Sequence, residues 1–309
     1  MRTTPSQAAN KMVDNDAAQF SGPDLNDALV SAMESFRATH PPQSAEAAGH
    51  TWTYIVSGSG AEAILILPGL HGLADAAFRY MTALEPHYRV ITPNYPAEVM
   101  TLAAMADGLA ALLDLEGIEQ AHVYGGSFGA LVAQAFVRCH GARVLSVILE
   151  HTLFPRRRNG ALILPLMVMA RTLPSQISRM LLDLGVTTFQ RQITHGREFW
   201  TAYFHRAIAS FSREDILARL SVLKDFYVHG RASLVKLQDW SGRALIVVAE
   251  ADSLAPPRDC QDLLAHYAGA EVELMPGSSH MGAVAEPERY IAVYTRFLGI
   301  EVGDQRTSA

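Results

Sequence analysis

The sequence predicts an α/β fold in which helices cover both faces of a mostly parallel central sheet. Three observations support this prediction. From His50 onward, short apolar segments alternate with helical segments of about 10 to 15 residues. The run Ala63–Leu67 is apolar throughout, as expected of a strand that is buried on both faces. The alternation stops over residues 153–240, which have a helical pattern, and resumes at Ala244.

Residues 1–48 precede the alternating segments and are expected to form an N-terminal leader. They are poor in aromatic residues and rich in Ala, Ser, Gln, Asn and Asp. Within them, Asp24–Thr39 is expected to form one short helix, because Asp24 can cap its start and Pro41-Pro42 follows its end. We expect the rest of the leader to be mobile.

Residues 49–152 are expected to form the first part of the α/β core. Thr51–Val56 is predicted to be an edge strand, and a serine–glycine turn separates it from the buried strand Ala63–Leu67. The remaining elements are predicted, in order, at Ala76–Leu84 (helix), Tyr88–Thr92 (strand), Thr101–Leu115 (helix), Ala121–Tyr124 (strand), the segment after Ser127 (helix) and Val144–Leu149 (strand).

Residues 153–240 are predicted to be a helical cap, or lid, inserted after the strand that ends near Leu149. We expect its helices to break at Pro165, Pro174, Gly185 and Gly196. Residues 241–300 complete the core, and 301–309 form a tail. The elements predicted for this second part are Ala244–Ala249 (strand), Pro257–Tyr267 (helix), Val272–Met275 (strand) and Pro287–Leu298 (helix).

Composition narrows the possible classes of protein. The 309 residues are 49% hydrophobic and carry a net charge of −6. The net charge therefore gives no electrostatic reason to expect binding to nucleic acid. The N-terminus lacks the apolar segment of a signal peptide, and no apolar run is long enough to span a membrane. Cys139 and Cys260 lie far apart and are expected to be reduced. We therefore expect a cytoplasmic protein, of unknown oligomeric state.

The segment Gly125-Gly126-Ser127-Phe128-Gly129 contains the pattern G-x-S-x-G between a predicted strand and a predicted helix. This is the context of a nucleophile elbow, where a strained turn presents a serine at a helix N-terminus. The glycines would remove side chains that collide with the neighbouring strand and helix. A tightly packed or phosphate-binding turn is the alternative, but the sequence lacks the glycine patterns typical of phosphate loops. We predict that Ser127 is a catalytic nucleophile.

A serine nucleophile needs a base that is oriented by an acid, and in this type of fold the acid precedes the base along the chain. Asp252 is the preferred acid, because it lies in the loop after the strand at Ala244–Ala249. Glu250 and Glu150 are rivals, since each also follows a predicted strand. A solvated loop carboxylate is the alternative for all three.

His280 is the predicted base among 12 histidines. It follows the last predicted strand, and the small residues Gly277, Ser278 and Ser279 before it leave room for the imidazole to reach a serine. Considered alone, it could be an ordinary surface histidine. The order Ser127, Asp252, His280 favours the catalytic interpretation.

An oxyanion hole requires two backbone N–H donors. Phe128, directly after the nucleophile, should supply one of them. The other is expected from the segment Pro68-Gly69-Leu70-His71-Gly72, with Leu70 preferred and His71 or Leu73 as alternatives. His71 could instead contact the substrate or pack beneath the loop.

Neither a metal site nor a cofactor is predicted. The sequence contains no H-x-x-x-H, no H-E-x-x-H, no paired C-x-x-C and no dinucleotide-binding fingerprint. The predicted chemistry needs only protein side chains and backbone amides.

These motifs together resemble the α/β-hydrolase superfamily over roughly residues 50–300. Leu73–Arg79, Tyr88–Ile91 and Tyr95-Pro96 are in addition similar to maspardin-like proteins. The resemblance implies an α/β-hydrolase fold. Maspardin-like members are often viewed as binding proteins without an intact triad, whereas this chain has His280 at the position of the base.

The motifs and the resemblance both predict a serine hydrolase that forms an acyl-enzyme. Apolar and aromatic residues of the cap suggest a small-molecule carboxylic ester with an apolar acyl group. The same triad could cleave C–C bonds, thioesters or lactones, or transfer the acyl group to an acceptor other than water. A non-catalytic, maspardin-like binding protein is the alternative from another class.

Overall fold

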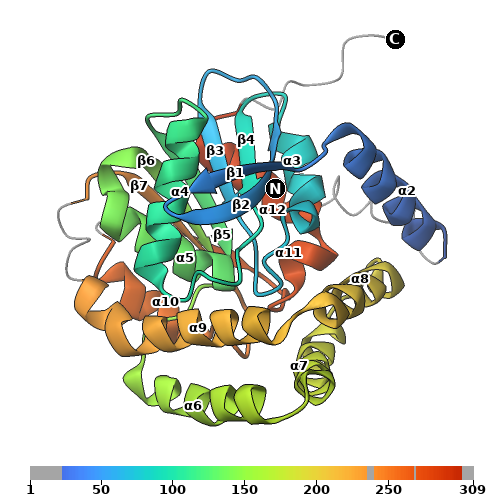
Figure 1. Ribbon diagram of the computed structural model, residues 1–309. Helices are drawn as coiled ribbons and strands as arrows, with labels where there is room; N and C mark the ends of the chain where they lie inside the picture. Colours follow the sequence, from blue (N-terminus) through green and yellow to red (C-terminus); the bar gives the residue numbers. More distant parts are fainter. Residues whose placement is uncertain (1–22, 235–239, 268, 301–309) are drawn as a thin grey trace, which may run out of the picture.

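The computed structural model describes residues 23–234, 240–267 and 269–300; the rest of the expected leader and the tail lie outside the described residues. Its centre is an eight-stranded sheet in the order β1-β2-β4-β3-β5-β6-β7-β8 (Figure 1). Strands β3 to β8 pair in parallel, whereas β1 and β2 run antiparallel to their neighbours. The predicted mostly parallel sheet is therefore confirmed. The strands are β1 (Gln43–Ala47), β2 (His50–Ser57), β3 (Ala63–Leu67), β4 (Arg89–Pro93), β5 (Ala121–Gly126), β6 (Val144–Glu150), β7 (Arg243–Ala249) and β8 (Glu271–Met275).

The central strands are apolar on both faces because helices cover both faces. All five residues of β3 are buried. Leu65 and Leu67 pack into one hydrophobic core, while Ile64 and Ile66 pack into the core on the opposite face. Each fully buried Leu or Ile side chain stabilises the fold by about 1.5–3 kcal/mol, so the two cores hold the sheet firmly in place.

One core lies beneath α4 (Leu102–Leu115), α5 (Phe128–His140) and α10 (Pro257–Leu264). The other lies beneath α2 (Pro23–Thr39), α3 (Phe78–Leu84) and α12 (Pro287–Leu298). Among the described residues, no helix combines the length and apolar character needed to cross a membrane. Three short helical segments complete this part of the fold: η1 (Ala74–Ala77), η2 (Gly141–Arg143) and α11 (Gly282–Ala285).

Four consecutive helices are inserted between β6 and β7 and lie together at one end of the sheet (Figure 1). Two expected breaks, Pro174 and Gly196, fall between these helices, but Pro165 and Gly185 lie inside them, so these two break predictions were wrong. Both residues are solvent-exposed, and the helices continue through them. The inserted helices are α6 (Arg157–Thr172), α7 (Ser175–Gln190), α8 (Arg197–Ser210) and α9 (Arg213–Leu234).

Strand β1 corrects a second prediction. It pairs with the outer side of β2, so the segment expected to be the edge strand is the second strand of the sheet, and the sheet starts inside the expected leader. Ala48 and Gly49 connect the two strands with φ angles of +49° and +78°. Two positive φ angles are what a tight two-residue hairpin needs, but the pair Ala-Gly is not one of its usual sequence signals.

Candidate active site

Ser127 occupies the turn between β5 and α5, in a backbone conformation that side chains rarely adopt. Its φ and ψ are 52° and −116°, a strain of about 1–3 kcal/mol that the surrounding structure must support. The Ser127 amide donates to the Glu150 carbonyl at 2.9 Å, and the Ser127 carbonyl accepts from the Ala130 amide at 3.0 Å. These bonds fix the serine at the N-terminus of α5.

The glycines on either side of Ser127 allow this tight turn. A Cβ atom at Gly125 would lie 2.3 Å from the Gly129 carbonyl oxygen. A Cβ atom at Gly129 would lie 2.1 Å from the Leu67 carbonyl oxygen. Real Cβ atoms do not approach backbone atoms so closely, so the G-x-S-x-G spacing follows from the close contact of β5, α5 and β3.

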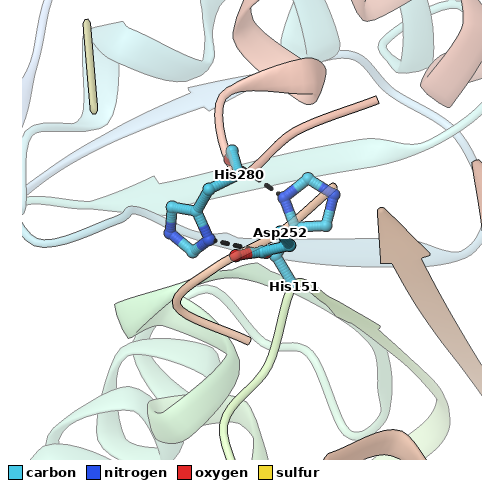
Figure 2. Close-up of side chains that lie close together, drawn as sticks. All are labelled: His151, Asp252 and His280. Carbon is cyan, nitrogen blue, oxygen red and sulfur yellow. Dashed lines mark hydrogen bonds and ion pairs between the residues drawn. The ribbon is translucent and has the colours of Figure 1, made fainter. Parts of the chain in front are cut away.

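His280 lies in the loop after β8 and joins Ser127 to Asp252. Its Nε2 lies 2.9 Å from Ser127 Oγ, and its Nδ1 lies 2.8 Å from Asp252 Oδ2 (Figure 2 shows the latter contact). The side chains of His280 and Asp252 are 8% and 0% exposed. Since a carboxylate only accepts hydrogen bonds, Nδ1 carries the proton and Nε2 is free to accept from the Ser127 hydroxyl.

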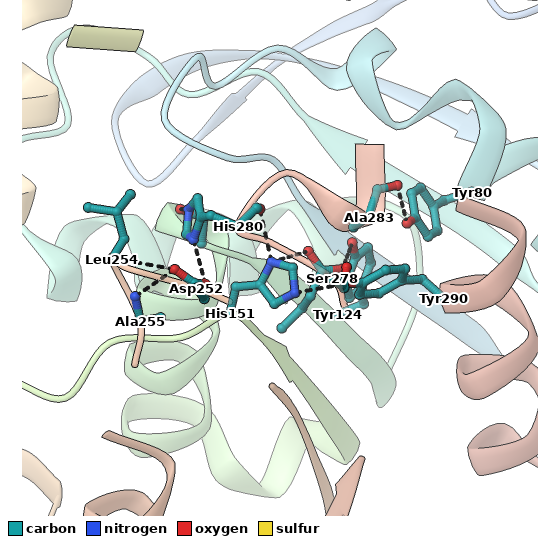
Figure 3. Close-up of polar contacts among 12 residues, drawn as sticks. Tyr80, Tyr124, His151, Asp252, Leu254, Ala255, Ser278, His280, Ala283 and Tyr290 are labelled. Carbon is teal, nitrogen blue, oxygen red and sulfur yellow. Dashed lines mark hydrogen bonds and ion pairs between the residues drawn. The ribbon is translucent and has the colours of Figure 1, made fainter. Parts of the chain in front are cut away.

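Asp252, in the loop after β7, is held as a carboxylate by several donors. Its Oδ1 accepts from the Leu254 and Ala255 amides at 2.8 Å and 2.9 Å (Figure 3). Burial raises the pKa of Asp252. The hydrogen bond and charge of His280, together with the hydrogen bond from the Ala255 amide, lower this pKa by more, so it lies below its ordinary value. Asp252 therefore orients the His280 ring through this hydrogen bond, and its role as the catalytic acid stays a prediction.

The two rival carboxylates have other partners. Glu150 is buried, and its Oε2 accepts from the Tyr124 hydroxyl at 2.7 Å and from the Tyr294 hydroxyl. Glu250 is exposed and accepts from the Gly277 amide at 2.9 Å. Among the described residues, Asp252 is the carboxylate that is hydrogen-bonded to the His280 side chain.

His151 is a site residue that the sequence did not reveal. It is buried, its φ is +47°, and its Nδ1 lies 3.0 Å from the His280 carbonyl oxygen (Figure 3). Its Nε2 lies 3.0 Å from the Tyr290 hydroxyl, which also contacts Ser278 Oγ at 2.8 Å. Because burial lowers its pKa, His151 is neutral: Nδ1 donates to His280 and Nε2 accepts from Tyr290. His151 thus holds the backbone that carries the base.

His151, Asp252 and His280 also offer one possible metal-ligand atom each, all within 4.8 Å of one another (Figure 2). The positions of the protons on the two histidines favour hydrogen bonding over metal binding. The protons on Nδ1 of His280 and Nδ1 of His151 each point to an oxygen acceptor inside the protein. A metal ion needs unprotonated nitrogen ligands, so this hydrogen-bonded arrangement fits an oriented base better than a metal centre.

The loop after β3 lies beside Ser127, where an oxyanion hole is expected. Tyr95 fixes both ends of this loop: its hydroxyl donates to the Pro68 carbonyl at 3.0 Å, and its amide donates to the Gly72 carbonyl at 3.0 Å. Within the described part of the chain, neither the Leu70 amide nor the Phe128 amide donates to a protein acceptor. Both are thus available to a ligand, and their role as the oxyanion hole stays a prediction.

The two alternatives named for the second donor differ in what surrounds them. The Leu73 amide is already used, because it donates to Nδ1 of His71 at 3.1 Å. His71 lines the cavity beside Ser127, and burial lowers its pKa to about 4, so its imidazole is neutral near pH 7. A neutral His71 that accepts at Nδ1 carries its proton on Nε2.

A cavity of about 530 Å³ lies between the inserted helices and this site. Ser127 and His280 line it together with the loop after β3. Its other lining side chains are mostly apolar, and many of them come from α6 to α9, including Leu166, Leu182, Phe189, Phe204 and Ile216. Phe189 of α7 lies with its ring centroid 6.1 Å from that of His280, so the insertion contacts this histidine directly.

Comparisons with known proteins agree with the observed fold. Residues 64–293 match the sequence profile described as the Alpha/beta hydrolase family. The chain is 31% identical over 153 residues to the dihydrolipoyllysine-residue acetyltransferase component of the acetoin cleaving system of Cupriavidus necator, covering 47% of this chain and 39% of that protein. It is also 36% identical over 89 residues to maspardin of Danio rerio, covering 28% of each. Each match spans less than half of the relative's length.

Solved structures share the fold at lower identity. An enol-lactonase from Burkholderia xenovorans superposes with a TM-score of 0.70 at 19% identity, over 83% of this chain and 100% of that one. An esterase from Exiguobacterium antarcticum superposes with a TM-score of 0.70 at 17% identity, over 83% of this chain and 99% of that one. At these identities the likeness establishes a common architecture.

Proposed function

The chain belongs to the alpha/beta hydrolase family, and we propose on that premise that it is a serine hydrolase of carboxylic esters. One observation carries the proposal: the hydrogen-bonded series from Ser127 Oγ through the two nitrogens of His280 to Asp252. A serine hydroxyl is a weak nucleophile unless a neighbouring base takes its proton. Here the base is in contact with the hydroxyl, and the acid that orients the base is ionised.

In the proposed mechanism, Nε2 of His280 takes the Ser127 proton as Oγ attacks the ester carbonyl carbon. The carbonyl oxygen becomes an oxyanion, which the Leu70 and Phe128 amides and the N-terminus of α5 stabilise. The protonated His280 then gives its proton to the alcohol oxygen as the ester bond breaks. Water attacks the resulting acyl-enzyme by the same steps and releases the acid.

The inserted helices suggest the kind of acyl group. We propose that residues 153–240 act as a cap and that the acyl chain lies among the apolar side chains of α6 to α9. A cavity of about 530 Å³ is within the usual size range for small-molecule sites. The proposed substrate is therefore a small ester whose acyl group is apolar and longer than acetyl.

A panel of p-nitrophenyl esters of increasing acyl length, with lactone and thioester arms, tests this function. We expect ester hydrolysis that rises from acetate to medium-length acyl groups. Ser127→Ala should lower kcat by at least about three orders of magnitude, because it removes the nucleophile. Ser44→Ala, on the exposed edge strand β1, is the matched control and should retain full activity.

Hydrolysis that survives in Ser127→Ala would exclude the proposed mechanism. If the wild-type protein hydrolyses only the lactones or only the thioesters, the role of Ser127 as nucleophile would stand, but esters would not be its substrate class. A lack of turnover on every arm would favour a binding role for the fold.

A further inference from the structure

Glu150 is the one acidic residue among the side chains that line the cavity in the described part of the chain. It is the last residue of β6, and it is 4% exposed. A buried carboxylate in a mostly apolar cavity is costly unless its oxygens are hydrogen-bonded. The contacts of its two oxygens therefore indicate its role.

The two oxygens of Glu150 have different surroundings. The Tyr124 and Tyr294 hydroxyls both donate to Oε2. Across the described residues, no group donates a hydrogen bond to Oε1. Nδ1 of His151 lies 3.7 Å from Oε1, but its proton is directed to the His280 carbonyl at 3.0 Å. Oε1 is thus an acceptor whose partner has to come from the cavity.

Oε1 lies beside the residue that precedes the nucleophile, and both Glu150 and Ser127 line the same cavity. A Cβ atom at Gly126, the residue before Ser127, would lie 2.9 Å from Oε1. The backbone of Glu150 itself accepts the Ser127 amide at 2.9 Å. Gly126 therefore leaves the space beside Oε1 free of a side chain, one residue before Ser127 in the chain.

We propose that Glu150 forms a polar subsite that selects esters with a hydroxyl group near the acyl carbonyl. The hydroxyl donates to Oε1, while the rest of the acyl chain lies in the apolar cavity. This inference rests on the proposed ester hydrolase function. It assigns to Glu150 the binding of substrate, in place of the role of catalytic acid for which the sequence made it a candidate.

The experiment compares three substrates: methyl octanoate, methyl 2-hydroxyoctanoate and methyl 3-hydroxyoctanoate, with acid release as the readout. A buried acceptor without a partner disfavours the substrate that lacks the donor. We expect the wild type to prefer at least one hydroxy ester over the octanoate by about tenfold or more in kcat/KM. This comparison needs no variant.

Glu150→Gln tests the assignment to this residue. The amide oxygen of Gln must accept from Tyr124 and Tyr294, which turns the NH₂ group toward the cavity, where it cannot accept a hydroxyl proton and can only donate a neutral hydrogen bond to the hydroxyl oxygen. The preference for the hydroxy ester should fall several-fold, because a hydrogen bond to a carboxylate is stronger than one between neutral groups. Glu150→Asp, which shortens the side chain and withdraws the carboxylate, should reduce it in the same way if Glu150→Gln does not fold.

Tyr294→Phe is the matched control. It removes a hydrogen bond to the same carboxylate without changing Oε1. If Glu150 only anchors tyrosines, Tyr294→Phe and Glu150→Gln should change the substrate ratio alike; under the proposal only Glu150→Gln changes it. Equal wild-type rates on all three esters would overturn the subsite and leave the hydrolase intact, whereas no turnover together with an unreactive Ser127 would overturn both.

Discussion

At the scale of single residues, the strained conformation of Ser127 is possible because the glycines on either side of it have no side chains. Ser127 has a φ of 52°, and the space around it exists because Gly125 and Gly129 have no side chains. The glycine spacing in the sequence indicates this close approach of β3, β5 and α5. The pattern predicts the geometry because residues with side chains do not fit at these two glycine positions.

Replacing Gly129 by Ala should therefore destabilise the whole fold. The added Cβ would lie 2.1 Å from the Leu67 carbonyl oxygen, and backbone atoms on both sides must move. We expect a loss of about 1–3 kcal/mol in the free energy of unfolding, measured by urea titration. Gly185→Ala is the control, because no atom lies within 4 Å of its added Cβ and it should gain up to about 1 kcal/mol in helix α7. Equal stability of Gly129→Ala and wild type would refute this account of the elbow.

Residue-level prediction from the sequence reached some positions and missed others. Motif order predicted Ser127, Asp252 and His280, and the structure brings their side chains into hydrogen-bonding contact, although their catalytic roles stay predictions. His151 could not be predicted, because its importance lies in a positive φ angle and a contact with the His280 backbone. Neither feature leaves a signal in the local sequence.

At the scale of elements, continuous apolar runs gave the inner parallel strands correctly, because β3 to β7 are largely buried, whereas the parallel edge strand β8 is mostly exposed. Strand β1 was missed, since Gln43–Ala47 is mostly polar and exposed and owes its conformation to pairing with β2. The breaks expected at Pro165 and Gly185 were wrong: both residues are exposed, and packing by other residues of each helix against neighbouring helices outweighs the local propensity. For α6, that packing is mainly against α9.

The inserted helices give a prediction about acyl length. Val186 of α7 lines the cavity, so Val186→Trp should fill part of it. We expect kcat/KM to fall by about tenfold or more for p-nitrophenyl decanoate and to change little for the acetate, because the acetyl group needs less of the cavity. Val168→Trp, on α6 at a position 58% exposed and outside the cavity lining, is the control and should leave both rates unchanged. A uniform loss on both esters in Val186→Trp would show that the cavity does not hold the acyl chain.

At the scale of the whole molecule, the site depends on the topology of the sheet. Ser127, Asp252 and His280 follow β5, β7 and β8, and these parallel strands end at the same edge of the sheet. The sequence allowed this convergence to be predicted from chain order. The position of the inserted helices over the site could not be predicted in detail, because it depends on packing between surfaces that no local pattern specifies.

The most direct test of the account is covalent labelling by a fluorophosphonate probe, followed by peptide mass spectrometry. Only an activated serine reacts readily with such a probe. We predict a single adduct on Ser127 of the 309-residue chain, strongly slowed labelling in His280→Gln and no labelling in Ser127→Ala. An unlabelled wild-type protein, or an adduct that forms at the same rate without the His280 imidazole, would contradict the claim that Ser127 is the activated nucleophile.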